Sequence, residues 1–213
     1  MLKGSSVETG YYDFLERYLV PVLRFFKLRP NHVSFLGLVT SILTGILFAF
    51  TTLWGGLFTL LTGLLDTLDG SLARNTGQSK KSGAFLDSVL DRYSELIIYL
   101  GIWFYFYRNG GTAPFFSIAI LLILFGSLMV SYTRARAEGL GVNCLVGLFQ
   151  RGERIVLIGI AGVLNSLCNG LLAIPATHWA RDIVLIVALL VLALGTNLTA
   201  LWRFFHVLKA LRQ

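Results

Sequence analysis

The sequence predicts an all-α integral membrane protein with six transmembrane helices and an N-terminal amphipathic helix at the membrane interface. Hydrophobic residues make up 55% of the chain and charged residues only 14%, and the mean hydropathy is +0.73. Apolar runs long enough to cross a bilayer recur along the chain. We place the six spans at residues 33–53, 55–74, 83–107, 114–134, 155–168 with its flanks, and 183–207.

The segment before the first span, residues 11–27, intersperses apolar and charged side chains. This pattern is typical of a helix that lies in the membrane interface. Pro21 is expected to bend the helix, and Pro30 marks the boundary before the first span. The first ten residues are polar, so no cleavable secretory signal is expected. Because no internal repeat is visible, we predict one domain, 1–213, with an interfacial segment at 1–32 and a six-helix bundle at 33–213.

Basic residues concentrate on one side of the predicted topology. They precede the first span, lie between spans two and three and between spans four and five, and end the chain, whereas the opposite loops contain only Arg108 and Arg181. The positive-inside rule therefore predicts a multi-pass protein of the cell membrane with both termini in the cytoplasm. The net charge of +7 is explained by anionic lipid headgroups, and we expect no nucleic-acid partner because no nucleic-acid motif is present.

Four aspartates interrupt the second and third apolar runs. Asp66 and Asp69 are three residues apart, whereas Gly83, Asp87 and Asp91 follow one another at intervals of four. On helices, these separations place each group on one face. An aspartate at the centre of a membrane helix costs about 3 kcal/mol, so unneutralised carboxylates are unfavourable there. Hard divalent ions such as Mg²⁺ or Mn²⁺ bind all-oxygen ligand sets, and the spacing predicts a paired-metal site.

The same aspartates belong to a longer pattern. The chain reads D-x-x-D-G-x-x-A-R, then eight residues at 75–82, then G-x-x-x-D-x-x-x-D. This pattern resembles the signature of the CDP-alcohol phosphotransferase family, and the agreement is far more specific than a lone glycine motif. The matching residues are Asp66, Asp69, Gly70, Ala73, Arg74, Gly83, Asp87 and Asp91.

The resemblance implies a fold and a reaction. The fold has six membrane helices around a polar cavity that opens to the cytoplasm, and the protein is a homodimer. The reaction transfers a substituted phosphoryl group from a CDP-linked donor to an alcohol and releases CMP. The resemblance also implies that Asp66, Asp69, Asp87 and Asp91 bind two divalent cations, and that Asp91 is the base that takes the proton of the attacking hydroxyl.

The other motif residues are assigned to the nucleotide. Gly70 and Gly83 would let the nucleotide approach the backbone, Ala73 keeps the surface shallow, and Arg74 would add a charge-assisted contact. Close helix packing is an alternative explanation for the two glycines and for Ala73. The predicted nucleotide-binding set is Asp66, Asp69, Gly70, Ala73, Arg74 and Gly83.

Arginines gather again at 131–154, after the fourth span. A phosphorylated acceptor would explain them, because guanidinium groups make bidentate contacts with phosphate. The run at 131–138 is similar to the phosphatidylinositol phosphate and archaetidylinositol phosphate synthase branch, whereas Gln150 and Gly152 depart from the second element of that branch. Ordinary anchoring at the cytoplasmic membrane surface is the alternative. The predicted acceptor-phosphate residues are Ser131, Arg134, Arg136, Arg151 and Arg154.

The sequence therefore predicts a membrane transferase that moves a phosphatidyl-type group from CDP-diacylglycerol, or an ether-lipid equivalent, to inositol phosphate. A phosphatidylglycerophosphate synthase is the nearest alternative, because its acceptor, glycerol 3-phosphate, would use the same arginines. An ion-coupled membrane transporter is a further alternative, since carboxylates inside membranes often mark ion pathways.

Overall fold

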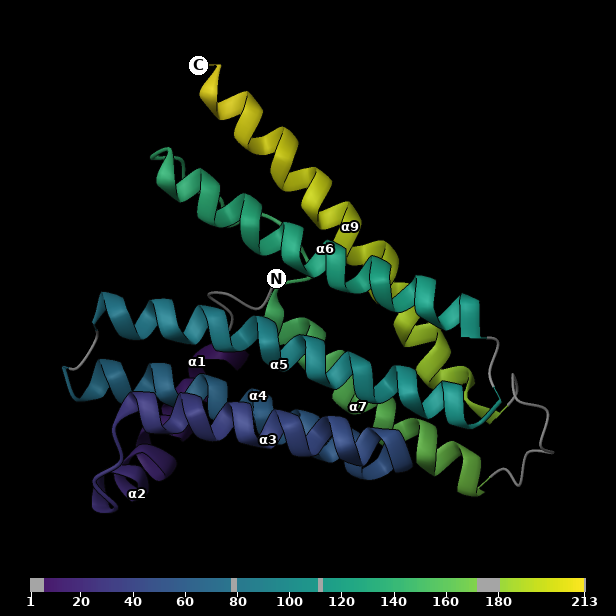
Figure 1. Cartoon of the computed structure of the whole chain (residues 1–213). Coiled ribbons are helices and arrows are strands. Elements are labelled where there is room, and N and C mark those ends of the chain that lie inside the picture. Colours follow the sequence, from purple (N-terminus) through teal and green to yellow (C-terminus); the bar gives the residue numbers. More distant parts are fainter. Residues whose placement is uncertain (1–5, 78–79, 111–112, 172–180, 213) are drawn as a thin grey trace.

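The computed structural model describes residues 6–77, 80–110, 113–171 and 181–212. Every regular element in these ranges is helical, which confirms the all-α prediction (Figure 1). The elements are α1 (Ser6–Phe14), the π-helix η1 (Leu15–Leu19), α2 (Val20–Phe25), α3 (Pro30–Phe50), α4 (Thr52–Asn75), α5 (Lys81–Arg108), α6 (Ala113–Gly139), α7 (Arg151–Leu171) and α9 (Ile183–Leu211).

Four helices among the described residues are long and apolar enough to cross a membrane, namely α3, α6, α7 and α9. The chain is therefore a multi-pass helical membrane protein by the length and composition of its helices. The predicted second and third spans correspond to α4, with 24 residues, and α5, with 28 residues. Both exceed the roughly 20 residues that a span needs, but the charged motif residues interrupt their apolar sequence.

The helices pack in two groups. In Figure 1, α3, α4, α5 and α7 lie side by side, and α6 and α9 form a second layer that extends beyond them toward the C-terminus. The main packing partners are α3 with α4 and α5, α4 with α7, and α6 with α9. The largest buried cluster joins both groups through Phe48, Ile102, Ile158, Leu189 and their neighbours. The core therefore runs between the two layers.

Glycines allow the first group to pack closely. A Cβ atom on Gly101 of α5 would lie 2.2 Å from the carbonyl oxygen of Gly45 on α3. A Cβ atom on Gly56 of α4 would lie 2.6 Å from the carbonyl oxygen of Gly159 on α7. Small residues at such crossings let membrane helices approach without a side chain between them. These contacts hold α4 and α5, the two motif helices, at fixed positions relative to α3 and α7.

The N-terminal segment packs against α4. Leu15 and Val20 are buried in a small separate cluster with Leu65, Leu68 and Leu72 of α4. The opposite side exposes large rings, with Phe25 81% exposed and Phe26 66% exposed. An apolar body that covers α4 while aromatic rings point outward is compatible with the predicted interfacial position.

A network of hydrogen bonds joins three helices at the end of the bundle opposite the motif. The Oδ1 atom of Asp182 accepts hydrogen bonds from Tyr105 at 3.0 Å, from Asn165 at 2.7 Å and from Asn169 at 3.3 Å. The backbone N–H of Leu185 donates in turn to Asn165. These bonds tie α5, α7 and the start of α9 together, so a buried carboxylate there is satisfied by neutral donors.

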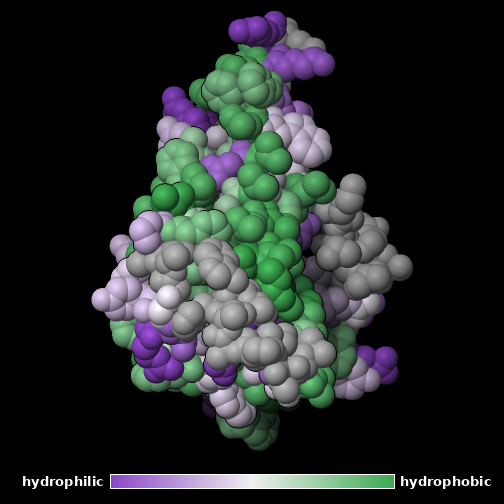
Figure 2. Space-filling view, turned by 90° about the vertical axis from the view of Figure 1, so that its right-hand side faces the viewer, coloured by the Kyte–Doolittle hydropathy of each residue, from purple (hydrophilic) through white to green (hydrophobic). Residues whose placement is uncertain are grey.

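Apolar side chains also dominate the outer surface. Figure 2 shows a column of hydrophobic residues between the hydrophilic residues at the upper end of the view and those near the lower edge. Leu194 and Leu198 of α9 are 68% and 64% exposed, and Leu121 of α6 is 64% exposed. Such a surface is unfavourable in water and matches the hydrocarbon core of a bilayer.

The contact between α3 and α5 can be tested with Gly101→Ala. We expect a loss of about 1–3 kcal/mol, because the new methyl group meets backbone atoms that cannot move aside. Gly170→Ala on α7 is the matched control, since no atom of the described part of the chain lies within 4 Å of its Cβ position. Thermal denaturation of both variants in detergent measures the difference. Equal melting temperatures would contradict the packing described for Gly101.

Candidate metal and nucleotide site

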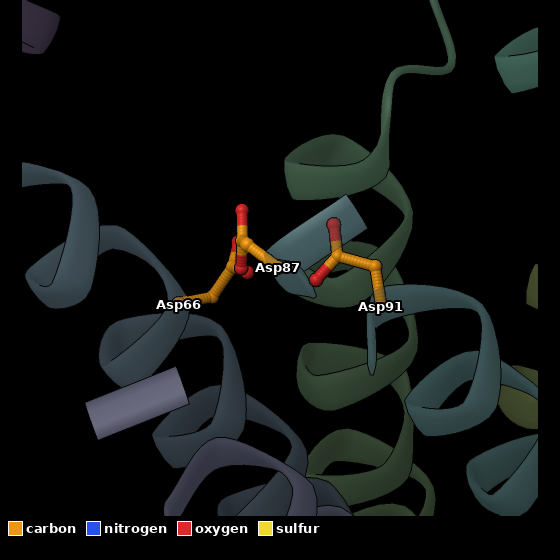
Figure 3. A group of neighbouring side chains, drawn as sticks. All are labelled: Asp66, Asp87 and Asp91. Atoms are coloured by element: carbon orange, nitrogen blue, oxygen red, sulfur yellow. The ribbon is translucent and has the colours of Figure 1, made fainter. Parts of the chain in front are cut away.

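The carboxylates of the motif meet between α4 and α5. Oxygen atoms of Asp66, Asp87 and Asp91 all lie within 4.8 Å of one another. Figure 3 shows that Asp66 reaches from α4 toward Asp87 and Asp91 on α5. Asp66 of α4 and the four-residue pair Asp87 and Asp91 of α5 therefore bring side chains from two helices to one point. Sequence reasoning predicted this convergence from the helical period alone.

The three clustered aspartates line a cavity. Asp69 lines this cavity too, but it is not part of the group of oxygen atoms within 4.8 Å of one another. All four aspartates line it, together with Ser34, Thr62, Ser94 and Arg151. Asp69 is only 5% exposed, and its Oδ2 atom accepts a hydrogen bond of 2.6 Å from the hydroxyl of Ser34 on α3. Asp69 thus lies between the cavity of the carboxylate cluster and a second, neighbouring hollow, because it lines both.

Arg151, the first residue of α7, reaches into the carboxylate cluster. Its Nη1 atom contacts Oδ1 of Asp66 and lies 2.7 Å from Oδ1 of Asp91. Its Nε atom is buried without a hydrogen-bond partner among the described residues. A guanidinium in this position neutralises part of the negative charge, which would otherwise make the partly buried carboxylates costly. Sequence reasoning assigned Arg151 to the acceptor phosphate and did not predict its contact with the aspartates.

The donor set suits a hard divalent cation. Three carboxylates within 4.8 Å of one another, with a fourth on the same cavity, offer only oxygen ligands. Mg²⁺ and Mn²⁺ prefer carboxylate oxygens and water, and two carboxylates from each helix would hold such ions between α4 and α5. The residues present therefore fit the predicted divalent metals.

A second hollow adjoins the carboxylate cavity and has a volume of about 210 Å³. Gly70, Ala73, Arg74 and Gly83 line it, and Asp69 and Asp87 form its border with the aspartate cluster. The predicted nucleotide residues therefore surround one space, except Asp66, which lines the carboxylate cavity. Five further lining residues were not in the predicted set, namely Pro30, Asn31, Ser34, Lys80 and Ala84.

The two motif glycines are not at helix crossings. Among the described residues, a Cβ atom on Gly70 would meet only the Arg74 side chain at 3.4 Å, and one on Gly83 only the Asn31 side chain at 3.4 Å. These are ordinary van der Waals distances, unlike the clash at Gly101. Close packing against another helix therefore does not explain these glycines. A side chain there would instead project into the hollow.

Arg74 is held by two contacts at the edge of this hollow. Its Nη2 atom donates to the hydroxyl of Ser71 at 3.0 Å, and its guanidinium carbon lies 5.3 Å from the ring centroid of Tyr12 on α1. The N-terminal segment therefore contacts a motif residue directly through a cation–π interaction.

The predicted acceptor residues do not form one cluster. Arg134 is paired with Glu138 at 2.8 Å on the exposed end of α6, and Arg136 is also exposed. Arg154 is buried and bonds to Glu95 and to the backbone carbonyl of Phe149. Of the five predicted residues, only Arg151 lines the carboxylate cavity. The arginines are close in sequence, but the ends of α6 and α7 separate them in space.

Two residues near the cavity were missed. Arg92 and Glu95 are not among the predicted site residues. Arg92 donates to Glu95 at 3.0 Å and to the hydroxyl of Ser131 at 2.7 Å. The signal available in the sequence was the continuation of the Asp87 and Asp91 face by one further turn to Glu95.

Residues 27–208 match the family model described as CDP-alcohol phosphatidyltransferase. The chain belongs to this family. An archaetidylinositol phosphate synthase from Methanothermobacter thermautotrophicus is 35% identical over 210 residues, which cover 98% of both chains. The family assignment therefore extends over almost the whole sequence.

Solved structures show the same fold. A crystal structure of Mycobacterium tuberculosis phosphatidylinositol phosphate synthase with CDP-DAG bound has a TM-score of 0.74 at 28% identity and covers 90% of this chain and 94% of its own. A structure of the same synthase in complex with manganese and citrate also has a TM-score of 0.74, at 27% identity, and covers 89% and 87%. As a CDP-alcohol phosphatidyltransferase, the protein is a phosphotransferase enzyme, and its family and aspartate cluster indicate a divalent metal cofactor.

Removing the arginine from the cluster should make the phosphatidyltransferase depend more on metal for stability. In Arg151→Gln, the carboxylates lose a buried positive charge, so we expect a lower melting temperature in EDTA and a larger stabilisation by Mn²⁺ than in the unsubstituted protein. Melting curves with and without Mn²⁺ measure both effects. Arg134→Gln removes an exposed arginine as the control, and an equal Mn²⁺ response in both variants would argue against the charge balance described here.

Proposed function

We propose that the protein transfers a phosphatidyl-type group from CDP-diacylglycerol, or from an ether-lipid equivalent, to inositol phosphate and releases CMP. The observation that carries this proposal is the junction of two spaces at Asp69 and Asp87. One space holds the carboxylate cluster, and the other is lined by the glycine-containing part of the motif. A nucleotide in the second space would place its diphosphate at the carboxylates. The names of the relatives support inositol phosphate as the acceptor.

We further propose a topology with six spans, in which α4 and α5 are the second and third. Their lengths and their packing against α3 and α7 support this assignment. Residues 1–32 would lie at the interface, and 33–213 would form the catalytic bundle of a single domain. The distribution of basic residues supports a cytoplasmic position for the site and both termini. The family resemblance supports a homodimer.

Asp66, Asp69, Asp87 and Asp91 would hold two divalent cations, Mg²⁺ or Mn²⁺. When bound, these cations would neutralise the diphosphate of the donor and stabilise the departing CMP. Asp69 is already oriented by Ser34. Gly70, Ala73, Arg74 and Gly83 would bind the nucleotide, with Arg74 held by Ser71 and Tyr12.

The reaction would be a direct displacement. A hydroxyl oxygen of the acceptor forms a bond to the phosphorus that bears the lipid, and the bond from this phosphorus to the CMP oxygen breaks. CMP leaves with the electron pair, and the hydroxyl proton passes to Asp91. Asp91 suits this role for two reasons. It lines the same cavity as the other three aspartates, and its Oδ1 atom contacts Arg151, a predicted acceptor residue at the start of α7.

Arg151 is the acceptor-side residue that the geometry favours most, because it lies within the cavity. Ser131 is linked to the same region through Arg92, which is 3.6 Å from Asp91. Arg134 and Arg136 lie farther along α6, where they could receive the acceptor before it enters. The role of Arg154 as a phosphate ligand stays a prediction, because its guanidinium is occupied by Glu95.

The acceptor can be tested by measuring CMP release from CDP-diacylglycerol and Mn²⁺. Inositol phosphate is expected to stimulate release at least about tenfold more than free inositol, because the arginine at the cavity would bind its phosphate. EDTA should abolish the reaction. Release that responds to glycerol 3-phosphate and not to inositol phosphate would change the assignment to a phosphatidylglycerophosphate synthase.

The base can be tested with Asp91→Asn. The amide cannot accept the hydroxyl proton, so turnover should fall at least about 100-fold while binding of CDP is largely kept. The assay combines CMP release with CDP binding measured by calorimetry. Asp13→Asn, at an exposed position on α1, is the control. Substantial turnover by Asp91→Asn would remove this residue from the role of base.

A further inference from the structure

A buried ion pair between Glu95 and Arg154 lies one helical turn beyond Asp91 along α5. Glu95 is 3% exposed and Arg154 is 1% exposed, and the two come from α5 and α7. Oε1 of Glu95 accepts hydrogen bonds from Nε of Arg154 at 2.9 Å and from Nη2 at 2.5 Å. Replacing a buried ion pair by apolar residues is often neutral or stabilising, so stability alone is a weak explanation for this pair.

The two oxygen atoms of Glu95 hold different arginines. Oε1 binds Arg154, whereas Oε2 accepts from Nη1 of Arg92 at 3.0 Å. The same Nη1 atom of Arg92 donates to the hydroxyl of Ser131 on α6 at 2.7 Å. The other terminal nitrogen of Arg92 lies 3.6 Å from Oδ2 of Asp91. One carboxylate therefore connects α5, α6 and α7 beside the proposed base.

Arg154 also contacts the segment immediately before α7. Nη1 of Arg154 donates to the backbone carbonyl of Phe149 at 2.8 Å, just before the helix starts at Arg151. Arg154 follows Arg151 by three residues, so the two side chains leave the same face of α7 about one turn apart. Holding Arg154 against Glu95 thus sets the rotation of the first turn of α7. This rotation carries Arg151 to Asp66 and Asp91.

We propose that Glu95 is a positioning residue for the acceptor side of the site. It holds Arg154 and Arg92 from within the bundle, so that Arg151 and Ser131 are presented on either side of Asp91. Arg154 acts in this arrangement as the link between Glu95 and the start of α7. The proposal deepens the proposed function and rests on it, because the acceptor must bind where Arg151 meets the aspartates. Gly70, Ala73, Arg74 and Gly83 border the other hollow, so donor binding should not depend on Glu95.

The first test is Glu95→Gln, assayed by CMP release with the acceptor and the donor varied separately. A glutamine keeps the shape but offers one acceptor oxygen, and its amide N–H group would face a guanidinium. We expect the acceptor KM to rise at least about tenfold and the donor KM to stay within about twofold. Equal changes in the two KM values, or no change in either, would overturn the proposal.

Glu138→Gln is the matched control. Glu138 also pairs with an arginine, but its side chain is 54% exposed at the end of α6. The same chemical change there should leave both KM values within about twofold, because exposed ion pairs contribute little to the position of a helix. An acceptor KM raised equally in both glutamine variants would show a general charge effect and contradict a specific role for Glu95.

A charge-free double variant separates positioning from folding. Glu95→Leu combined with Arg154→Met removes both charges of the buried pair, and Arg92, which is partly exposed, keeps its contacts with Ser131 and Asp91. We expect its melting temperature to be close to that of the unsubstituted protein, while its acceptor KM remains raised at least about tenfold. A well-folded double variant with an unchanged acceptor KM would show that the pair only stabilises the fold, and would overturn the proposal.

Failure of the proposed function would be visible in the unsubstituted protein. If this protein releases no CMP with either inositol phosphate or glycerol 3-phosphate, the proposed function is wrong. The shift in melting temperature caused by inositol phosphate then tests Glu95 without turnover, with the shift caused by CDP and Mn²⁺ as the reference. A phosphate-dependent shift lost in Glu95→Gln supports the proposal. A shift that survives in this variant, or that the unsubstituted protein lacks, overturns it.

Discussion

The structure depends on the neutralisation of acidic side chains inside an apolar helical bundle. Carboxylates from α4 and α5 converge within 4.8 Å, and their mutual repulsion must be offset for the two helices to keep these positions. Arg151 supplies a positive charge from α7, and Ser34 supplies a hydroxyl from α3. Four helices therefore meet at this point because each one contributes a carboxylate or a partner for one.

The glycines divide into two kinds according to what surrounds them. Gly45, Gly56, Gly101 and Gly159 lie where two backbones touch, and they bring the four helices close enough for the carboxylates to meet. Gly70 and Gly83 have no such neighbour and border an open hollow. The same residue type thus sets the spacing of the bundle in one place and leaves room for a ligand in another.

Arg151 and Arg154 illustrate how neighbouring residues acquire separate partners. Both leave the first turn of α7 toward α5, yet Arg151 meets Asp66 and Asp91, whereas Arg154 meets Glu95. The first contact lies on the cavity, and the second is almost completely buried. A charge on the cavity side can exchange partners when a ligand enters, but a charge enclosed by the bundle keeps its partner because exposing or unpairing it is unfavourable.

The sequence by itself determined the helical class, the four aspartates and their convergence. Apolar runs indicate membrane helices, and the spacings of three and four follow the period of a helix, so Asp66 could be related to Asp87 and Asp91 without coordinates. It also indicated the family, because the motif occupies fixed positions. Only the tertiary structure decided which arginine reaches the aspartates. The side on which a helix begins, and the rotation of its first turn, depend on contacts with other helices, which no local pattern along the chain encodes.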